Sequence, residues 1–141
     1  MKNNLLKHTT GVGRTTGVGR TMIGTIRADV LAYTAGKDVE LDACLVDADC
    51  IASAAHVTML AGLPLQPRIF SARTGRRVLT ELVRIMHRAH RGAFTIKLQD
   101  QDVHLAVERE LTRRLGELGR KIHAGRSRND QVAVDLRLFA K

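Results

Sequence analysis

The sequence predicts an all-α protein. Three observations predict this fold class. Aromatic residues make up only 3% of the chain, so leucine, valine, isoleucine and alanine must form most of the core. Apolar and small residues recur at intervals of three and four, and residues that favour helix ends flank these segments. With 141 residues, 44% hydrophobic and 26% charged, the composition is that of one globular domain.

The first segment, residues 1–25, contains the repeat TTGVGR at 9–14 and again at 15–20. Its glycines invite comparison with a phosphate-binding loop, but the spacing and the GK[ST] ending of that loop are missing. Four glycines in twelve residues, with little to bury, are typical of a flexible tail. We therefore predict a tail before about residue 22 and an organised domain from residue 26.

A first helix is predicted at about 40–63, ended by Pro64. A second is predicted at 71–91, with Ser71 as N-cap and Gly92 where a C-cap glycine belongs. FTIK at 94–97 is a candidate extended segment. The expected inward positions of the first helix are 41, 45, 48, 52, 55, 59 and 62, and those of the second are 78, 79, 82, 83, 85, 86 and 89.

A third helix is predicted at 102–117, with an apolar stripe at 103, 107, 111, 115 and 118. His104 and Glu108 lie one turn apart on it and could begin a metal site. Local spacing places no third ligand, so pairing or capping within the helix is the favoured interpretation and no metal site is expected.

A fourth helix is predicted to start near Asn129. Positions 132, 133, 136, 139 and 140 form one apolar stripe, and 134 and 138 form a second. A helix that is apolar on two sides is expected to be covered on both. Residues 1–141 offer nothing for the second side, so we predict self-association or instability.

The stretch HAGRSRNDQ, residues 123–131, gathers many directional hydrogen-bonding groups at the start of this helix. Helix N-termini favour anions, and arginine binds a carboxylate with two parallel hydrogen bonds. The alternative is an N-cap, since Ser127, Asn129 and Asp130 all cap helices well. A cap explains one or two of these residues, whereas a site for a small carboxylate explains the set.

Lys and Arg number 23 against 14 Asp and Glu, a net charge of +9, which attracts polyanions. Nucleic acid is not the expected partner, because few aromatic residues are available for base stacking and no binding motif is recognisable. Cys44 and Cys50 are too far apart along a helix for a disulfide, which fits a reducing compartment. No 18-residue apolar run and no secretory signal are visible, so a cytoplasmic protein without a membrane span is expected.

HAGRSRNDQVAVDLRL (123–138) resembles the first signature of the argininosuccinate lyase family, within the fumarase and aspartase superfamily. YTAGKDVELDACLVDADCIASAAHVTML (33–60) is similar to the family's first long helix and its approach. QDVHLAVERELTRRLGELGRKIH (101–123) is similar to the segment before the signature. The resemblance covers roughly residues 26–141, and RSRNDQ is its most specific part.

The resemblance implies an N-terminal helical domain at 26–123, followed at 124–141 by the signature loop and the first turns of a central helical bundle. It also implies that Ser127, Arg128 and Asn129 bind the substrate, argininosuccinate. The family's reaction removes a proton beside a carboxylate and expels a guanidinium nitrogen, giving fumarate and arginine in arginine biosynthesis. The family uses no cofactor, and its active site is assembled from three subunits of a homotetramer.

Several positions depart from the family pattern. Ala124 replaces a Thr or Ser, Gln99 and Gln101 dilute an acidic run, and Asp38 stands where many members have a substrate-contacting serine. The family's catalytic acid, base and serine loop lie in two later signatures that residues 1–141 do not contain. No catalytic residue is therefore assigned, and the chain alone is expected to be inactive.

Two interpretations follow. The chain is either the N-terminal part of a longer or split lyase, completed by a second fragment or by other subunits, or a degenerate remnant. In the second case it would be a non-catalytic helical module that binds a partner subunit or an acidic polymer.

Overall fold

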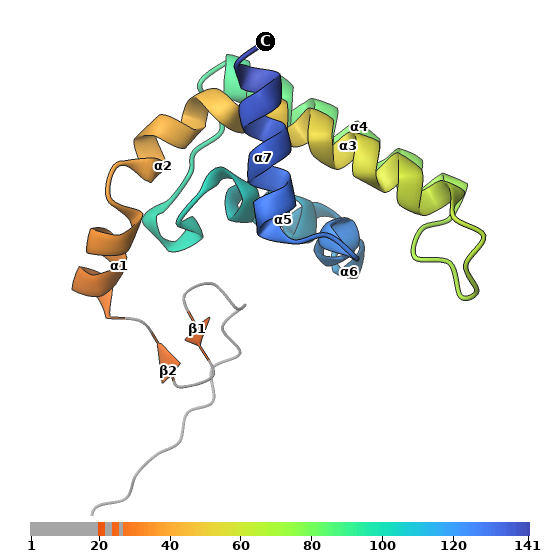
Figure 1. Ribbon diagram of the computed structural model, residues 1–141, viewed down its shortest axis with the longest axis horizontal. Coiled ribbons are helices and arrows are strands. Elements are labelled where there is room, and N and C mark those ends of the chain that lie inside the picture. The colour runs from red at the N-terminus through yellow and green to blue at the C-terminus, as the bar shows by residue number, and fades with distance from the viewer. Residues whose placement is uncertain (1–19, 22–23, 26) are drawn as a thin grey trace, which may run out of the picture.

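The computed structural model describes residues 20–21, 24–25 and 27–141 and confirms the all-α class (Figure 1). The one sheet in this part of the chain is a pair of two-residue antiparallel strands, β1 (Arg20–Thr21) and β2 (Gly24–Thr25). Nearly all of the predicted tail, including the first TTGVGR copy, lies outside the described residues. The helices are α1 (Ala28–Ala35), α2 (Asp38–Leu41), η1 (Asp42–Leu45), α3 (Val46–Gly62), α4 (Ala72–His90), η2 (Leu98–Asp100), α5 (Val103–Leu115), α6 (Glu117–Arg120), η3 (Lys121–His123) and α7 (Arg128–Phe139).

Helices α3 and α4 form an antiparallel pair, and α5 packs against both of them (Figure 1). Helix α7 crosses α3 steeply, next to the N-terminal half of α3. The short helices α6 and η3 carry the chain from the end of α5 back to the start of α7. This path brings the signature turn against both α3 and α5.

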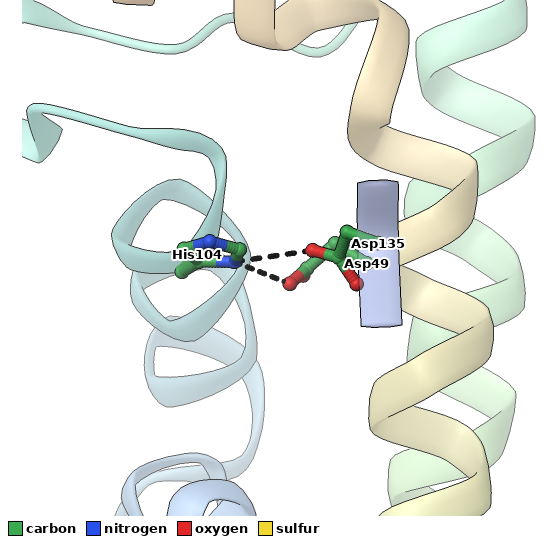
Figure 2. Close-up of side chains that lie close together, drawn as sticks. All are labelled: Asp49, His104 and Asp135. Atoms are coloured by element: carbon green, nitrogen blue, oxygen red, sulfur yellow. Dashed lines mark hydrogen bonds and ion pairs between the residues drawn. The ribbon is translucent and has the colours of Figure 1, made fainter. Parts of the chain in front are cut away.

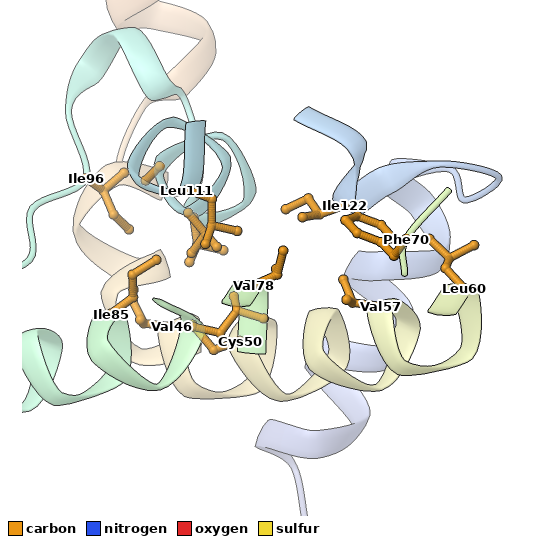
Figure 3. Close-up of a cluster of buried hydrophobic side chains, with 14 residues drawn as sticks. Val46, Cys50, Val57, Leu60, Phe70, Val78, Ile85, Ile96, Leu111 and Ile122 are labelled. Atoms are coloured by element: carbon orange, nitrogen blue, oxygen red, sulfur yellow. The ribbon is translucent and has the colours of Figure 1, made fainter. Parts of the chain in front are cut away.

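The hydrophobic core lies between α3, α4, α5 and η3, and Figure 3 shows its side chains meeting between these helices. Burial of apolar surface is the main term that stabilises such a layer. Its fully buried members include Val57 of α3, Val78 of α4, Leu111 of α5 and Ile122 of η3. The stripe predicted for the third helix is confirmed at its first three positions, 103, 107 and 111.

The helix ends predicted for α4 are confirmed. Ser71 Oγ accepts a hydrogen bond from the backbone N–H of Thr74, and the Thr74 hydroxyl accepts one from the N–H of Ser71. Gly92 follows the last turn with φ of +67°, a conformation that glycine adopts without steric cost.

The single helix predicted at 40–63 consists of three consecutive helical segments, and the positions predicted to face inward were partly wrong. The chain forms α2, η1 and then α3, while Leu41 and Met59 are 63% and 46% exposed. The buried face of α3 includes Asp49 and Ser53, which a search for apolar spacing passes over. Val83 was likewise expected inward on α4 and is exposed.

Two smaller differences concern local structure. Helix α1 was not predicted, although two of its residues, Leu31 and Ala35, are buried. Residues 94–97 form no strand, although Ile96 is buried in the core.

Taken together, the consecutive segments α2, η1 and α3 (Asp38–Gly62) are long and apolar enough to cross a membrane by length and composition, with a mean hydropathy of 1.4 over 18 residues. The search for an 18-residue apolar run did not anticipate this. The buried face of α3 packs against α4 and α5, as a core helix of a globular domain does. The apolar composition of α3 is thus explained by its place in the hydrophobic core.

Both cysteines are unpaired, as predicted. Cys44 is exposed and donates its S–H to the carbonyl oxygen of Leu41. Cys50 is buried in the core, and burial, together with the charge of Asp49, raises the pKa of its thiol. The thiol therefore stays protonated at neutral pH.

Candidate functional site

The signature turn begins α7 with a complete capping box. Ser127 Oγ accepts from the backbone N–H of Asp130 at 3.3 Å, and Asp130 Oδ2 accepts from the N–H of Ser127 at 3.0 Å. These reciprocal bonds hold the pKa of Asp130 below its usual value. The capping interpretation thus accounts for Ser127 and Asp130, and the arginines need a separate explanation.

A pocket of about 170 Å³ lies beside this turn. It is enclosed by the start of α5, by η3, by the turn itself and by the first turn of α7. Residues 104–108 of α5 and residues 123–131 therefore meet around one cavity. Its lining residues are His104, Leu105, Glu108, His123, Arg126, Arg128 and Gln131.

Two guanidinium groups line this pocket. Arg128 Nη1 lies 2.8 Å from Oδ2 of Asp102, the residue that caps α5. Arg126 Nη2 donates to His123 Nδ1 at 3.1 Å and lies 3.5 Å from Ser53 Oγ. A guanidinium carries five N–H donors, so each arginine keeps donors for a ligand. The buried Nε of Arg126 has no hydrogen-bond partner among the described residues.

The three residues expected to bind substrate do not face the pocket together. Arg128 lines it, whereas Ser127 caps the helix and Asn129 is exposed and does not line it. At 100° per residue, Asn129 lies about 200° from Gln131, on nearly the opposite side of α7. Arg128 lies about 60° from Gln131 and shares its side. Among the described residues, Asn129 therefore points toward solvent.

The titratable groups of the pocket are perturbed by burial. Burial, helped by the charge of Arg126, lowers the pKa of His123 to about 4. The ring is therefore neutral at pH 7, and its 3.5 Å contact with Glu108 Oε2 is not an ion pair there. Burial raises the pKa of Glu108, partly offset by Arg128 and Arg120. Fixed positive charge in the pocket thus comes from the two arginines.

A buried polar cluster adjoins the pocket (Figure 2). His104 Nδ1 of α5 lies 2.7 Å from Asp49 Oδ1 of α3 and 3.5 Å from Asp135 Oδ2 of α7. The prediction that His104 pairs within its own helix was wrong. Its partners come from two other helices, because His104 faces the junction of α3 and α7.

The cluster holds protons more tightly than isolated side chains do. Burial, and next the charge of Asp49, raise the pKa of Asp135 to about 7. Burial alone would lower the pKa of His104, but the hydrogen bond to Asp49 and the charge of Asp49 outweigh it, and the net shift is upward. Two carboxylates that share one imidazole in a buried site favour one retained proton.

The same three side chains offer one nitrogen and two oxygens within 4.8 Å of one another, a spacing that a cation could use. The side-chain amide nitrogen of Gln131 also points into this group and donates to Asp49 Oδ1. A donor directed at the carboxylates favours hydrogen bonding over cation binding. We therefore treat the cluster as a hydrogen-bonded network.

Sequence reasoning missed most of this arrangement. Asp49 and Ser53 on α3, and Gln131 and Asp135 on α7, are pairs spaced by four in otherwise apolar helices. Such polar pairs on one helical face were a readable signal of two helices in polar contact. His123 and Arg126 carried no comparable signal, because η3 and the turn place them.

The fold and the pocket together define an all-helical domain with a partly enclosed pocket lined by two arginines. Comparison with known proteins agrees, since a family described as Lyase matches residues 25–141. The chain belongs to this lyase family, whose fold is the all-helical fumarase/aspartase-like one.

The relatives confirm the resemblance to the N-terminal portion of argininosuccinate lyases. The chain is 46% identical over 116 residues to an argininosuccinate lyase of Bacteroides fragilis, a match that covers 82% of this chain and 25% of the relative. It is 43% identical over the same length to that of Bacteroides thetaiotaomicron, with the same coverage. It is 39% identical over 103 residues to that of Staphylococcus aureus, covering 73% of this chain and 22% of the relative. The chain thus spans about a quarter of the length of these relatives.

Proposed function

We propose that this chain is the N-terminal part of an argininosuccinate lyase and supplies carboxylate binding to the elimination of fumarate from argininosuccinate. In this reaction a proton is removed from the carbon beside one succinyl carboxylate, and negative charge builds on that carboxylate. The carbon–nitrogen bond then breaks, the charge forms the double bond of fumarate, and arginine leaves. Arginines fixed beside the succinyl carboxylates stabilise that charge as it forms, where electrostatic catalysis is largest. No cofactor is needed for this role.

One observation carries the proposal: Arg128 of the signature lines the same pocket as a second arginine, Arg126, and the His123 imidazole beside Arg126 is neutral. A dicarboxylate is the ligand class that two guanidinium groups suit best. The unpaired Nε of Arg126 and the unpaired Oε1 of Gln131 also favour a polar ligand or water in the cavity.

The remaining parts of the proposal concern the setting. We assign the protein to the cytoplasm and to arginine biosynthesis, because its relatives are argininosuccinate lyases and its two thiols are unpaired. Residues 26–123 form the helical domain and 124–141 begin a bundle shared with further subunits or a complementing fragment. Exposed Asn129 then contributes to a site formed with those parts.

The test is a chimaera in which residues 25–141 of this chain replace the matching segment of the Bacteroides fragilis relative. We expect the chimaera to release fumarate from argininosuccinate, measured by absorbance. In it, Asn129→Ala should lower kcat/KM by about 30-fold, roughly 2 kcal/mol, as loss of one donor to a developing charge does. Assembly should be unaffected, because the Asn129 side chain is exposed. Full activity of the Asn129→Ala chimaera would remove that residue from the substrate site.

A second candidate function is favoured by one observation, the concentration of arginine on the exposed side of α4. Arg73, Arg77 and Arg84 of α4, and Arg91 just after it, follow one another at intervals of four, seven and seven residues, and all four are exposed. Such a stripe fits the alternative of a non-catalytic module that binds an acidic polymer. A chimaera that folds and assembles but releases no fumarate would favour this alternative.

We expect the chain to self-associate through α7. Val134, Leu136 and Phe139 are exposed, and the side of α7 that faces α3 is polar, so the apolar surface has no partner among the described residues. Light scattering should show a mass above 15.5 kDa that rises with concentration. Leu136→Glu should restore the monomer, whereas the control Val83→Glu on α4 should not. A monodisperse wild-type monomer at high concentration would overturn this expectation.

A further inference from the structure

The most deeply buried residues of α7 are both polar. Gln131 is 1% exposed and Asp135 is 0% exposed, and they lie one turn apart on the same face. The large apolar residues of α7 are all exposed. Apolar contacts are non-directional, whereas hydrogen bonds specify orientation. The rotation of α7 about its own axis is thus determined chiefly by these two side chains.

Their partners are on two other helices. The amide nitrogen of Gln131 donates to Asp49 Oδ1 and lies 3.4 Å from each of Ser53 Oγ, the Asp49 carbonyl oxygen and Asp135 Oδ1. Asp135 Oδ2 lies 3.5 Å from His104 Nδ1 of α5. Helix α7 is therefore held to α3 and α5 by one connected network.

The hydrogen-bonded network and the pocket have two residues in common. Gln131 and His104 belong to both, and Arg128 lies about 60° from Gln131 around α7. A rotation of α7 by one residue, 100°, would carry Arg128 out of the pocket and away from Asp102. The position of this guanidinium thus depends on contacts that it does not itself make.

We propose that Gln131 and Asp135 are positioning residues, which fix the rotation of α7 through Asp49, Ser53 and His104 and so hold the Arg128 guanidinium at the pocket. The proposal rests on the proposed carboxylate site for its function, but its structural part stands separately. Neither residue is assigned any proton transfer to substrate.

The network has a charge state that pH can change. The groups that face Asp135 are Asp49 and Cys50 from α3, His104 from α5 and Arg126 from the turn. Cys50 is a neutral thiol, so Asp49 is the negative charge that Asp135 faces, and the charge of Asp49 opposes ionisation of Asp135. Ionisation of Asp135 places a second negative charge beside Asp49, which loosens the contact of α7 with α3. Arg128 should therefore be less firmly held above neutral pH.

The test uses the 141-residue chain labelled with ¹⁵N-arginine, in which the Nε–H signals of Arg128 and Arg137 are followed from pH 5.5 to 8.5. We expect the Arg128 signal to shift and broaden as pH rises through about 7. In Asp135→Asn, which keeps the shape and removes the titration, it should stay constant. Arg137, also on α7 but outside the pocket, and the control variant Asp29→Asn should show no difference from the wild type. If the pH dependence of the Arg128 Nε–H signal is the same in wild type and Asp135→Asn, the proposal is overturned.

Gln131→Leu provides the second variant, because it keeps the side-chain size and removes the hydrogen bonds. Asp49 keeps its contact with His104, so the variant loses one hydrogen bond to a charged group and the part of the stability that this bond supplies. We expect helix content to be retained while affinity for fumarate, followed through the same signals, falls at least tenfold. Unchanged fumarate affinity in this variant would contradict the positioning role. The Arg128 signal could respond to pH as described while the wild-type chain binds no fumarate. That result would contradict the proposed carboxylate site but not the positioning role of Gln131 and Asp135.

Discussion

Gly119→Ala is expected to destabilise the domain by more than about 3 kcal/mol, the upper range for overpacking a core. A Cβ at Gly119 would lie 2.3 Å from the backbone N of Thr112 and 2.5 Å from the carbonyl carbon of Leu111. These atoms belong to the backbone of α5, so no flexible side chain can move aside. The substitution would push α6 away from α5 and displace η3, which carries the chain to the signature turn.

Gly62→Ala is the matched control for this variant. It lies at the end of α3, is exposed and has nothing within 4 Å of its Cβ position. Alanine is favoured over glycine in a helix by up to about 1 kcal/mol, so this variant should be as stable as the wild type or slightly more so. Urea unfolding followed by circular dichroism measures both. Equal midpoints for Gly119→Ala and Gly62→Ala would show that α6 does not pack on α5 as described.

Asp135→Asn is expected to change how stability depends on pH, by a few kcal/mol between pH 4 and pH 8. In the folded state the pKa of Asp135 is raised to about 7 from 3.8, so the folded chain keeps a proton that the unfolded chain releases. Stability then falls as pH rises through this window, because the folded state binds more protons there. Each unit of pKa difference corresponds to about 1.4 kcal/mol.

Two histidines act in opposite senses over the same range. The raised pKa of His104 adds stability that is complete below 6.5 and is lost as pH rises through the folded value. The pKa of His123, lowered to about 4, makes stability increase as pH rises from about 4 to 6.5. The His123 term is common to wild type and variant, whereas the charge of Asp135 contributes to the raised pKa of His104, so the difference between the two pH profiles reports Asp135 together with its effect on His104.

The measurement is the free energy of urea unfolding at several pH values for wild type, Asp135→Asn and the exposed control Asp29→Asn. The curves of wild type and Asp29→Asn should run parallel. The free energy of unfolding of Asp135→Asn minus that of the wild type should increase with pH and become constant above about pH 7. Parallel curves for all three proteins would mean that Asp135 ionises in the folded state as easily as in the unfolded state.

The starts of three helices were predictable from the sequence. Helices α4, α5 and α7 begin within one residue of the predicted starts at 71, 102 and 129, because helix capping is a local property of a few residues. The apolar stripe of α5 was also predictable, because its one buried face follows helical spacing.

The contact between α3 and α7 was not predictable in this way. Apolar spacing on α7 suggested that an apolar stripe faces the domain, whereas Gln131 and Asp135 face it. The polar partners, Asp49 and Ser53, lie about 80 residues earlier in the chain, and only the folded chain brings them together. Buried polar groups become interpretable once their partners are known, because each must be hydrogen-bonded.

The candidate site could be predicted only in part from the sequence. The signature stretch identified Arg128 and the helix start, but a linear motif does not say which side of the helix each residue occupies. The rotation of α7 separates Asn129 from the pocket, and η3 and the turn after it bring in His123 and Arg126. The role of the motif in substrate binding therefore depends on contacts outside the motif.

The central claim is that Arg128 holds a substrate carboxylate, and one measurement tests it most directly. This is kcat/KM for fumarate release by the Bacteroides fragilis chimaera carrying either Arg128→Gln or Arg137→Gln. Both variants remove one exposed-side arginine from α7, but only Arg128 lines the pocket. We predict a loss of at least about 100-fold for Arg128→Gln, as for a lost donor to developing charge, and no change for Arg137→Gln. Equal activities of the two variants would contradict the assignment of this pocket to the substrate.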